Sequence, residues 1–420
     1  MTYFSAYATV DENTLYIQGG ANVLNPSLLY SQFFSLDLSR SWNTSNPPWV
    51  EVTATGIPAR LKTAFHSMSL SKDSRTLTFW DMHTSPPYSV NYHLDTKKWE
   101  TLPAPPIEEP FVGKFCKAAT DPTTDHVYIP GGFGTSLLAY DPSSKASSTV
   151  PMPPGGSSMT WSMYTFAWND VRRSFLYFGG YESPAQSYFY EYTPAAVTPW
   201  TALDSYGPVP PQVADSCMVS AYNGAKMIVF GGRSSGQVSG MLYILDVATM
   251  TWTQGPSSQP RMAAACSVSG DNFVVWGGVS WDNTPARVLS TLTPDVYNMY
   301  TAQWTTNFIA KKDTPPRPTT TQPPESGTGT GTGRQGGGDE GFGRTVTGTG
   351  GFKTVTGVPG VGGPDTGPGT SKSSNAAIIG GALGGGVVII AIAGVLVVFW
   401  RRKRKSSQRR KSLPKEFWNI

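Results

Sequence analysis

A short apolar stretch that ends in two glycines recurs five times in the first three quarters of this 420-residue chain. Trp80-Asp81 follows a similar stretch, where a sixth pair is expected. The six pairs begin at positions 19, 80, 131, 179, 231 and 277, so their spacings are 61, 51, 48, 52 and 46 residues. Such a period indicates a solenoid, a propeller or an array of similar units. The paired glycines are Gly19, Gly20, Gly131, Gly132, Gly179, Gly180, Gly231, Gly232, Gly277 and Gly278.

Each repeat predicts four short β-strands, and the fifth repeat shows them most clearly. Its strands are expected at 217–222, 226–230, 241–246 and 251–254. Asn223-Gly224, between the first two strands, is a strong hairpin signal. Strands of this length and spacing indicate an all-β fold. The 45 glycines and 35 prolines of the chain also disfavour long helices.

The glycines and the tryptophans have separate expected roles in these repeats. A diglycine at the end of the second strand permits backbone angles that other residues avoid, and it lets another strand approach closely. A tryptophan in the fourth strand can fill the gap between neighbouring units. The candidates are Trp42 or Trp49, Trp99, Trp200, Trp252 and Trp304.

The pattern over roughly residues 3–306 resembles that of the kelch β-propellers. The kelch repeat also has an aromatic or acidic residue near the end of the third strand and a tryptophan a few residues later, as in Asp246 and Trp252. The resemblance implies a six-bladed kelch-type β-propeller over residues 1–310, with four strands in each blade. Trp80-Asp81, in place of a diglycine, departs from the pattern.

Residues that carry catalytic or metal chemistry are sparse. Some kelch-like propellers resemble galactose oxidase, whose copper site needs two tyrosines, two histidines and a cysteine linked to one tyrosine. One of those histidines comes late in the chain, whereas here the histidines are His66, His83, His93 and His126. The sequence also has no GxSxG, CxxC or HExxH motif. We therefore expect a protein that is not an enzyme, with no catalytic residue, metal or cofactor.

The three cysteines, Cys116, Cys217 and Cys266, each fall in a predicted first strand. First strands line the central channel of a propeller. Thiols of different blades are expected to lie too far apart to form a bridge. We therefore expect buried free thiols that pack as small hydrophobic side chains.

The composition changes sharply near residue 310. Residues 311–375 are rich in Pro, Thr and Gly, which predicts a disordered stalk. Residues 376–400 carry no charge and predict a transmembrane helix. The tail, residues 401–420, has nine Lys or Arg and one acid, and is expected to lie on anionic lipid. Residues 1–400 have a net charge of 23 − 27 = −4, which argues against nucleic acid as a partner.

The basic tail also predicts an orientation in the membrane. Basic residues beside a span normally stay in the cytoplasm, so the tail is expected in the cytoplasm and residues 1–375 outside, at the plasma membrane. The first residues lack the features of a signal peptide, and we expect that the true N-terminus is missing from the sequence. In the alternative reading, the chain is a cytosolic adaptor held by its C-terminal span.

Three local motifs carry further expectations. Asn43 begins an acceptor sequence for N-glycosylation. Ser412 follows a basic run that is typical of phosphorylation sites. Small residues at 380–385 favour a homodimer through the span.

A propeller followed by a stalk, one span and a basic tail resembles the single-pass kelch proteins of fungal surfaces. The resemblance implies a membrane-anchored module for binding, adhesion or scaffolding, with a protein or glycan partner. The longer loops after the diglycines are the candidate binding segments, although the sequence identifies no ligand-binding residue. These loops lie at 21–32, 83–87, 181–186, 233–240 and 279–287. The alternatives are the cytosolic adaptor and, less favoured, a propeller enzyme such as an oxidase.

Overall fold

The structure is a computed structural model, and its described residues all lie between positions 2 and 314. They are residues 2–52, 56–82, 87–103, 115–133, 136–152, 162–180, 189–280 and 293–314. They form an all-β structure with two short 3₁₀ helices, η1 (Ala59–Leu61) and η3 (Lys311–Asp313). No helix among them is long and apolar enough to cross a membrane. The predicted span and tail, and the predicted stalk from residue 315 onward, lie outside the described residues.

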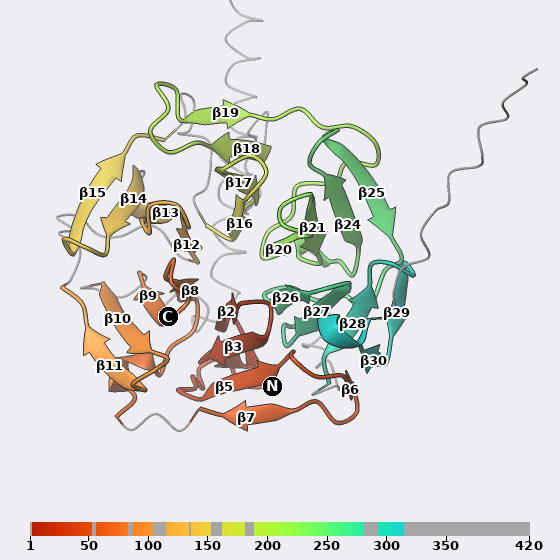
Figure 1. The fold of residues 1–420 in the computed structure, drawn as a ribbon, viewed down its shortest axis with the longest axis horizontal. Coiled ribbons are helices and arrows are strands. Elements are labelled where there is room, and N and C mark those ends of the chain that lie inside the picture. The colour runs from red at the N-terminus through yellow and green to blue at the C-terminus, as the bar shows by residue number, and fades with distance from the viewer. Residues whose placement is uncertain are drawn as a thin grey trace, which may run out of the picture. The chain divides into compact units, whose positions relative to one another are not determined.

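Six four-stranded sheets stand around a central axis, and each is formed by one continuous part of the chain (Figure 1). We number them blades 1 to 6 in chain order. In every blade the first strand is innermost, and it contacts the first strands of both neighbouring blades. The prediction of a six-bladed propeller is therefore confirmed.

The strands of the six blades are short, and those of blade 5 lie within one residue of their predicted ranges. Blade 1 contains β2 (Ala6–Val10), β3 (Thr14–Gln18), β5 (Phe33–Asp37) and β7 (Trp49–Glu51), and blade 2 contains β8 (Ser67–Leu70), β9 (Thr76–Asp81), β10 (Tyr88–His93) and β11 (Lys98–Thr101). Blade 3 contains β12 (Ala119–Thr120), β13 (Val127–Phe133), β14 (Ser136–Asp141) and β15 (Ala146–Val150), and blade 4 contains β16 (Tyr164–Asn169), β17 (Ser174–Gly179), β18 (Phe189–Tyr192) and β19 (Trp200–Ala202). Blade 5 contains β20 (Cys217–Ala221), β21 (Lys226–Phe230), β24 (Leu242–Asp246) and β25 (Thr251–Gly255), and blade 6 contains β26 (Ala265–Ser269), β27 (Asn272–Trp276), β28 (Asp295–Asn298) and β29 (Gln303–Thr305).

The diglycines lie where a blade meets the segment that enters the next blade. The second glycine donates its backbone N–H to a carbonyl of that segment: Gly20 to Thr63 (2.8 Å), Gly180 to Val213 (3.0 Å), Gly232 to Arg261 (2.9 Å) and Gly278 to Thr2 (3.1 Å). The first glycine of each of these pairs has a positive φ. A Cβ atom at Gly231 would lie 2.3 Å from the carbonyl oxygen of Arg261, so no larger residue fits without a backbone shift. Gly131 and Gly132 differ, since they lie within β13 at a shift of its register with β14.

Tryptophans of the fourth strands pack against the preceding blade, as expected. The ring centroids are 5.8 Å apart for Trp252 and Phe178, 5.6 Å for Trp304 and Phe230, 6.0 Å for Trp99 and Phe33, and 5.3 Å for Trp49 and Trp276. Aromatic pairs at these distances add to the stabilisation that comes from burial alone. Trp200 lies in β19 and contacts Tyr192 of its own blade at 4.9 Å. Trp42 is in no fourth strand and packs elsewhere.

Two departures from the repeat pattern meet between blades 2 and 3. Blade 2 has Trp80 in place of the first glycine of a pair, and β15 of blade 3 has no tryptophan. The buried Trp80 ring contacts Tyr140 of blade 3 with centroids 5.1 Å apart, and its Nε1 donates to Ser69 Oγ at 2.8 Å. We call the contact region between two neighbouring blades a seam. Trp80 therefore fills, from the preceding blade, the gap that a fourth-strand tryptophan fills at other seams.

Blades 1 and 6 close the ring without sharing a strand. The closing seam has the same Gly278–Thr2 hydrogen bond and tryptophan contact as the other seams. It also has a two-stranded ladder between β6 (Trp42–Asn43) and β30 (Asn307–Phe308), in which the Trp42 and Phe308 rings stack at 4.8 Å. Contacts between the two ends of the propeller therefore replace a shared strand.

The structure predicts that Gly231→Ala destabilises the protein much more than Gly236→Ala. Both glycines have positive φ, at +68° and +81°, but a Cβ at Gly236 would meet nothing within 4 Å. The second change is expected to cost about 1 kcal/mol from the backbone conformation alone. The first should cost at least ~2 kcal/mol, because the Arg261 carbonyl must also move. Urea unfolding of the two variants measures the difference, and equal losses would contradict this account of the diglycine.

Candidate functional site

Six residues around the axis share a left-handed backbone conformation. Each comes from the segment that enters one blade, and we call them the inner ring: Phe4 (φ 55°), Phe65 (68°), Phe115 (67°), Met163 (63°), Asp215 (57°) and Ala263 (55°). Four of them donate their backbone N–H to the carbonyl of the preceding member: Phe65 to Phe4 (2.9 Å), Phe4 to Ala263 (3.2 Å), Ala263 to Asp215 (2.8 Å) and Asp215 to Met163 (2.7 Å). Non-glycine residues rarely adopt this conformation, and such strain often lies at functional sites.

The side chains of the inner ring close one end of the propeller axis. Phe65 contacts Phe4 and Phe115 with ring centroids 4.4 Å from each, and Phe4 and Phe115 are 5.0 Å apart. These three half-buried rings, the aromatic triad, leave a cavity of only about 10 Å³ beside them. Such a cavity holds at most one water molecule. We call this end of the propeller the ring face, and the opposite end, with the first hairpin turn of each blade, the turn face.

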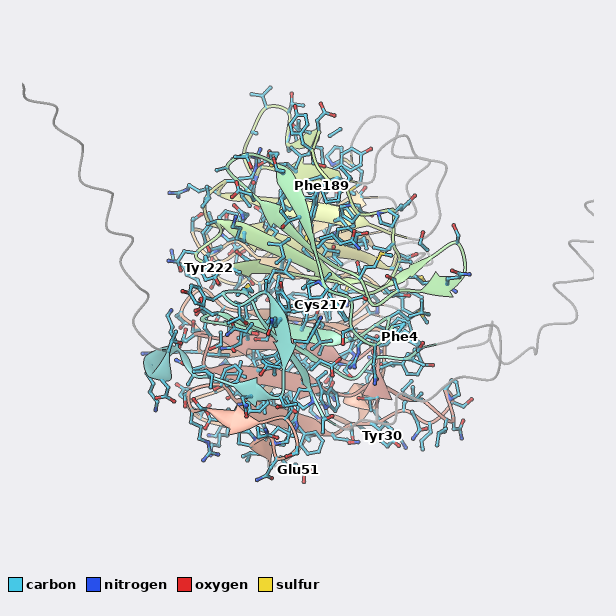
Figure 2. The ribbon with its side chains drawn as sticks, turned by 90° about the vertical axis from the view of Figure 1, so that its right-hand side faces the viewer. Phe4, Tyr30, Glu51, Phe189, Cys217 and Tyr222 are labelled. Carbon is cyan, nitrogen blue, oxygen red and sulfur yellow. A yellow bond between two sulfur atoms is a disulfide. The ribbon has the colours of Figure 1, made fainter. Side chains whose placement is uncertain are left out.

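Two of the predicted binding loops are described, and both lie on the ring face. In Figure 2, Phe4 and Tyr30 lie toward one end of the propeller and Tyr222, in a first hairpin turn, toward the other. The loop 21–32 begins with β4 (Ala21–Asn22), which pairs with β1 (Thr2–Tyr3) beside the inner ring. The loop 233–240 contains a hairpin of β22 (Arg233–Ser234) and β23 (Gln237–Val238). Of the predicted loops at 83–87, 181–186 and 279–287, only Pro87, Val279 and Ser280 are described.

Apolar packing anchors both described loops to the inner ring. Tyr3, Ala21, Val23 and Val279 belong to one buried cluster, against which Phe4, Phe65 and Val238 pack. The side chain of Asn22 organises the first loop, since its Oδ1 accepts from the N–H of Leu24 at 2.8 Å and of Asn25 at 3.0 Å. Leu24 is 77% exposed and Leu28 41% exposed. The loop therefore presents two apolar side chains on a fixed backbone.

A buried carboxyl group lies in the inner ring. Asp215 is only 6% exposed. Burial raises the pKa of its carboxyl to about 7, although the nearby charges of Lys117 and Arg233 act in the opposite direction. Burial lowers the pKa of Lys117, and Asp215 and Cys116 oppose that shift. Among the described residues there is no group of three or more His, Cys, Asp or Glu that could hold a metal ion.

The described histidines lie in three separate places. His66 is buried and pairs through Nε2 with Gln18, whose own amide donates to the Leu61 carbonyl at 2.8 Å. His126 is half-buried, and its Nδ1 lies 3.4 Å from the Thr124 carbonyl oxygen. His83 lies outside the described residues.

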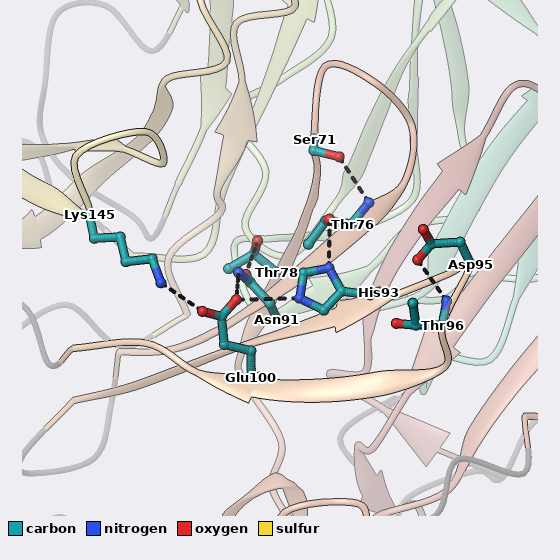
Figure 3. Close-up of polar contacts among 9 residues, drawn as sticks. All are labelled: Ser71, Thr76, Thr78, Asn91, His93, Asp95, Thr96, Glu100 and Lys145. Carbon is teal, nitrogen blue, oxygen red and sulfur yellow. Dashed lines mark hydrogen bonds and ion pairs between the residues drawn. The ribbon is translucent and has the colours of Figure 1, made fainter.

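His93 belongs to a polar network on the outer side of blades 2 and 3 (Figure 3). Its ring nitrogens lie 3.3 Å from Thr76 Oγ1 and 3.3 Å from Glu100 Oε2. Lys145 Nζ donates to Glu100 Oε1 at 2.7 Å, and this bond lowers the pKa of the Glu100 carboxyl. The network joins two blades at a half-exposed position, where ion pairs contribute little to stability.

The expectation about the cysteines is wrong for two of them. Cys217 and Cys266 form a disulfide, with Cα atoms 6.3 Å apart. They lie in β20 and β26, the innermost strands of blades 5 and 6, which converge at the axis and come within bridging distance. Cys116 is a buried free thiol, as expected, and burial raises its pKa to about 12.

Of the two predicted modification sites, Asn43 and Ser412, the described residues include only Asn43. Asn43 is exposed in β6, where its Nδ2 donates to Asn307 Oδ1 at 2.9 Å and its Oδ1 accepts from Ser45 N at 3.0 Å. Ser412 lies outside the described residues.

A family model for the KLHDC2/KLHL20/DRC7 Kelch-repeats domain matches residues 164–323. This segment contains blades 4 to 6. No curated protein matches the chain.

The raised pKa of Asp215 predicts that this residue lowers stability as the pH rises. The folded chain keeps the proton up to about pH 7, whereas the unfolded chain releases it near pH 3.8. Between these values the unfolded state therefore binds fewer protons, and the free energy of unfolding falls with increasing pH. Asp215→Asn keeps the left-handed backbone and does not ionise. Its stability relative to wild type should rise by up to roughly 4 kcal/mol over this range.

Urea unfolding between about pH 5 and 8 covers roughly 3 kcal/mol of this rise, the part that falls between pH 5 and the pKa of the folded chain. Asp246→Asn is the control, because the pKa of Asp246 is lowered to about 2 by its hydrogen bonds and its titration lies below that range. Its difference from wild type should stay constant, whereas a constant difference for Asp215→Asn would contradict the prediction.

Proposed function

We propose that this chain, a kelch-repeat β-propeller, is a membrane-anchored module that binds a protein partner on its ring face. Kelch domains generally bind proteins and are typically not enzymes. The observation that carries the choice of face is the exposure of Leu24 and Leu28 on a loop that is anchored to the inner ring. Loops that a rigid scaffold holds in place commonly carry the binding residues of a protein.

The surroundings of these leucines support a protein contact. The aromatic triad is half-buried nearby at the axis, and the hairpin β22–β23 stands on the same apolar cluster. Aromatic residues are enriched in the central part of protein interfaces, and the exposed leucines add apolar area beside the triad. Because the loop 21–32 is already ordered by Asn22, a partner would not have to order it.

Three observations support a location of the propeller outside the cytoplasm. The uncharged run at 376–400 is followed by a basic tail. The Cys217–Cys266 disulfide is the second, because disulfides persist in oxidising compartments and are rare in the cytosol. The third is the exposed position of the Asn43 acceptor sequence. The alternative, a cytosolic adaptor with a C-terminal anchor, accounts for the run and the tail but not for the disulfide.

The proposed orientation predicts that protease added to intact cells digests the propeller and leaves a C-terminal tag protected. Glycosidase treatment should reduce the mass of the wild-type chain and leave Asn43→Gln unchanged. Digestion of the propeller only after the plasma membrane is permeabilised would show that the cytosolic alternative is correct.

The proposed binding face predicts that Leu24→Asp with Leu28→Asp weakens capture of the partner. Placing a charge on each apolar anchor should reduce binding of the labelled protein to the surface of its own cell type by more than about tenfold. The control is Val197→Asp, which changes a fully exposed valine in the turn between β18 and β19. Equal binding by the two variants in flow cytometry would exclude the ring face as the interface.

A further inference from the structure

A second cavity lies on the other side of the inner ring. It has a volume of about 480 Å³ and is lined by the first strands of the blades. Residues of the first hairpin turns, among them Glu12, Lys72 and Asp170, form its mouth at the turn face. Its deep end reaches Ser5, His66 and Lys117 beside the inner ring. The cavity is in the size range of small-molecule sites and is separate from the loops of the ring face.

Lys117 brings into this cavity a positive charge that has no ion-pair partner among the described residues. Its ammonium makes no hydrogen bond or ion pair with any described residue, and its close neighbour is the Tyr7 ring, 5.6 Å from Nζ to centroid. The Lys117 backbone is fixed, since its N–H donates to Tyr164 Oη at 3.1 Å. Lys117 is half-buried in the cavity wall, and a positive charge without an ion-pair partner among the described residues attracts an anion into such a cleft.

Two hydroxyl groups near Lys117 also lack hydrogen-bond partners in the described part of the chain. Thr120 Oγ1 and Ser216 Oγ are both buried without a partner. Thr120 lines the large cavity, where a ligand could reach it, whereas Ser216 lines only the small one, where a single water molecule could satisfy it. Unsatisfied buried hydroxyls are unusual in folded proteins and need an explanation, such as a ligand.

The other charged groups near the cavity do not neutralise Lys117 directly. Glu12 pairs with Lys311 at 3.2 Å, and Asp170 Oδ1 accepts from Trp168 Nε1 at 2.9 Å. Lys72 Nζ donates to the Thr123 carbonyl at 2.7 Å and adds positive charge at the mouth. Asp215, on the ring side of Lys117, interacts with its charge at longer range but forms no ion pair with it within 4.0 Å.

We propose that this cavity binds a small organic carboxylate, with its negative charge at Lys117 and its body among the first strands. One ammonium balances one negative charge, whereas a phosphate dianion would keep one charge that Lys117 does not balance. Met218, Val268 and Phe166 in the lining provide contacts for an apolar body. This ligand site is independent of the proposed protein interface, so either can fail without the other.

Protection of Lys117 from acetylation tests the proposal on the wild-type chain in detergent. An N-hydroxysuccinimide ester acetylates amines, and mass spectrometry gives the rate at each lysine. Benzoate at millimolar concentration should slow the reaction of Lys117 by about tenfold and leave Lys145 unchanged. No protection by benzoate, or equal protection by neutral benzamide or by inorganic phosphate, would overturn the proposal.

Thermal unfolding provides a second measurement. Benzoate should raise the midpoint of wild-type unfolding, as any ligand that binds only the folded state does. Lys117→Met should remove this rise, whereas Lys145→Met, which removes an exposed ammonium, should keep it. The same rise in all three proteins would place the benzoate elsewhere and contradict the assignment.

Discussion

The hydrogen bond from a diglycine to the segment that enters the next blade is the contact on which the ring depends. It brings two backbones so close that a side chain at Gly231 would collide with a carbonyl group. The seam between the last and the first blade uses the same bond, between Gly278 and Thr2. The ring is thus closed by the same hydrogen bond that joins its other neighbouring blades. No blade needs a strand from the other end of the chain.

This close approach has a consequence at the axis. The entering segments must turn sharply into the innermost strands, and their turning residues adopt the left-handed conformation. Such a conformation costs on the order of 1–3 kcal/mol for each residue, and the hydrogen bonds and aromatic contacts of the inner ring offset it. Because these side chains lie at one end only, the two ends of the axis differ: one is covered by aromatic rings and the other leads into a cavity.

Most of the fold could be predicted from the sequence because its signals are local. Asn223-Gly224 and the strands of blade 5 lie where turn and strand preferences place them. The sequence shows that Trp80 stands where a glycine is expected. It does not show that Trp80 packs against Tyr140, because Tyr140 lies 60 positions later and belongs to another blade. The disulfide was missed for a similar reason: the distance between two blades varies with radius and is smallest at the axis, where Cys217 and Cys266 lie.

The candidate sites were predicted less well. The loops at 21–32 and 233–240 could be found from the diglycines that precede them. The inner ring could not, because Phe, Met, Asp and Ala have no common preference for a positive φ, and tertiary contacts impose it. Lys117 and Asp215 come from different blades, and no sequence pattern indicates that they face the same part of the axis.

The closing seam also determines how the propeller would respond to a pulling force. The chain leaves the described part after β30 and η3, beside the first blade. Tension at residue 314 would act on the β6–β30 ladder, the stacked rings of Trp42 and Phe308, and the hydrogen bond from Ser41 Oγ to Asp313 Oδ2 at 2.6 Å. A two-residue ladder yields more easily than a four-stranded sheet, and the next seam inward is held by a covalent bond between Cys217 and Cys266. Under load the ring would therefore open first between blades 6 and 1.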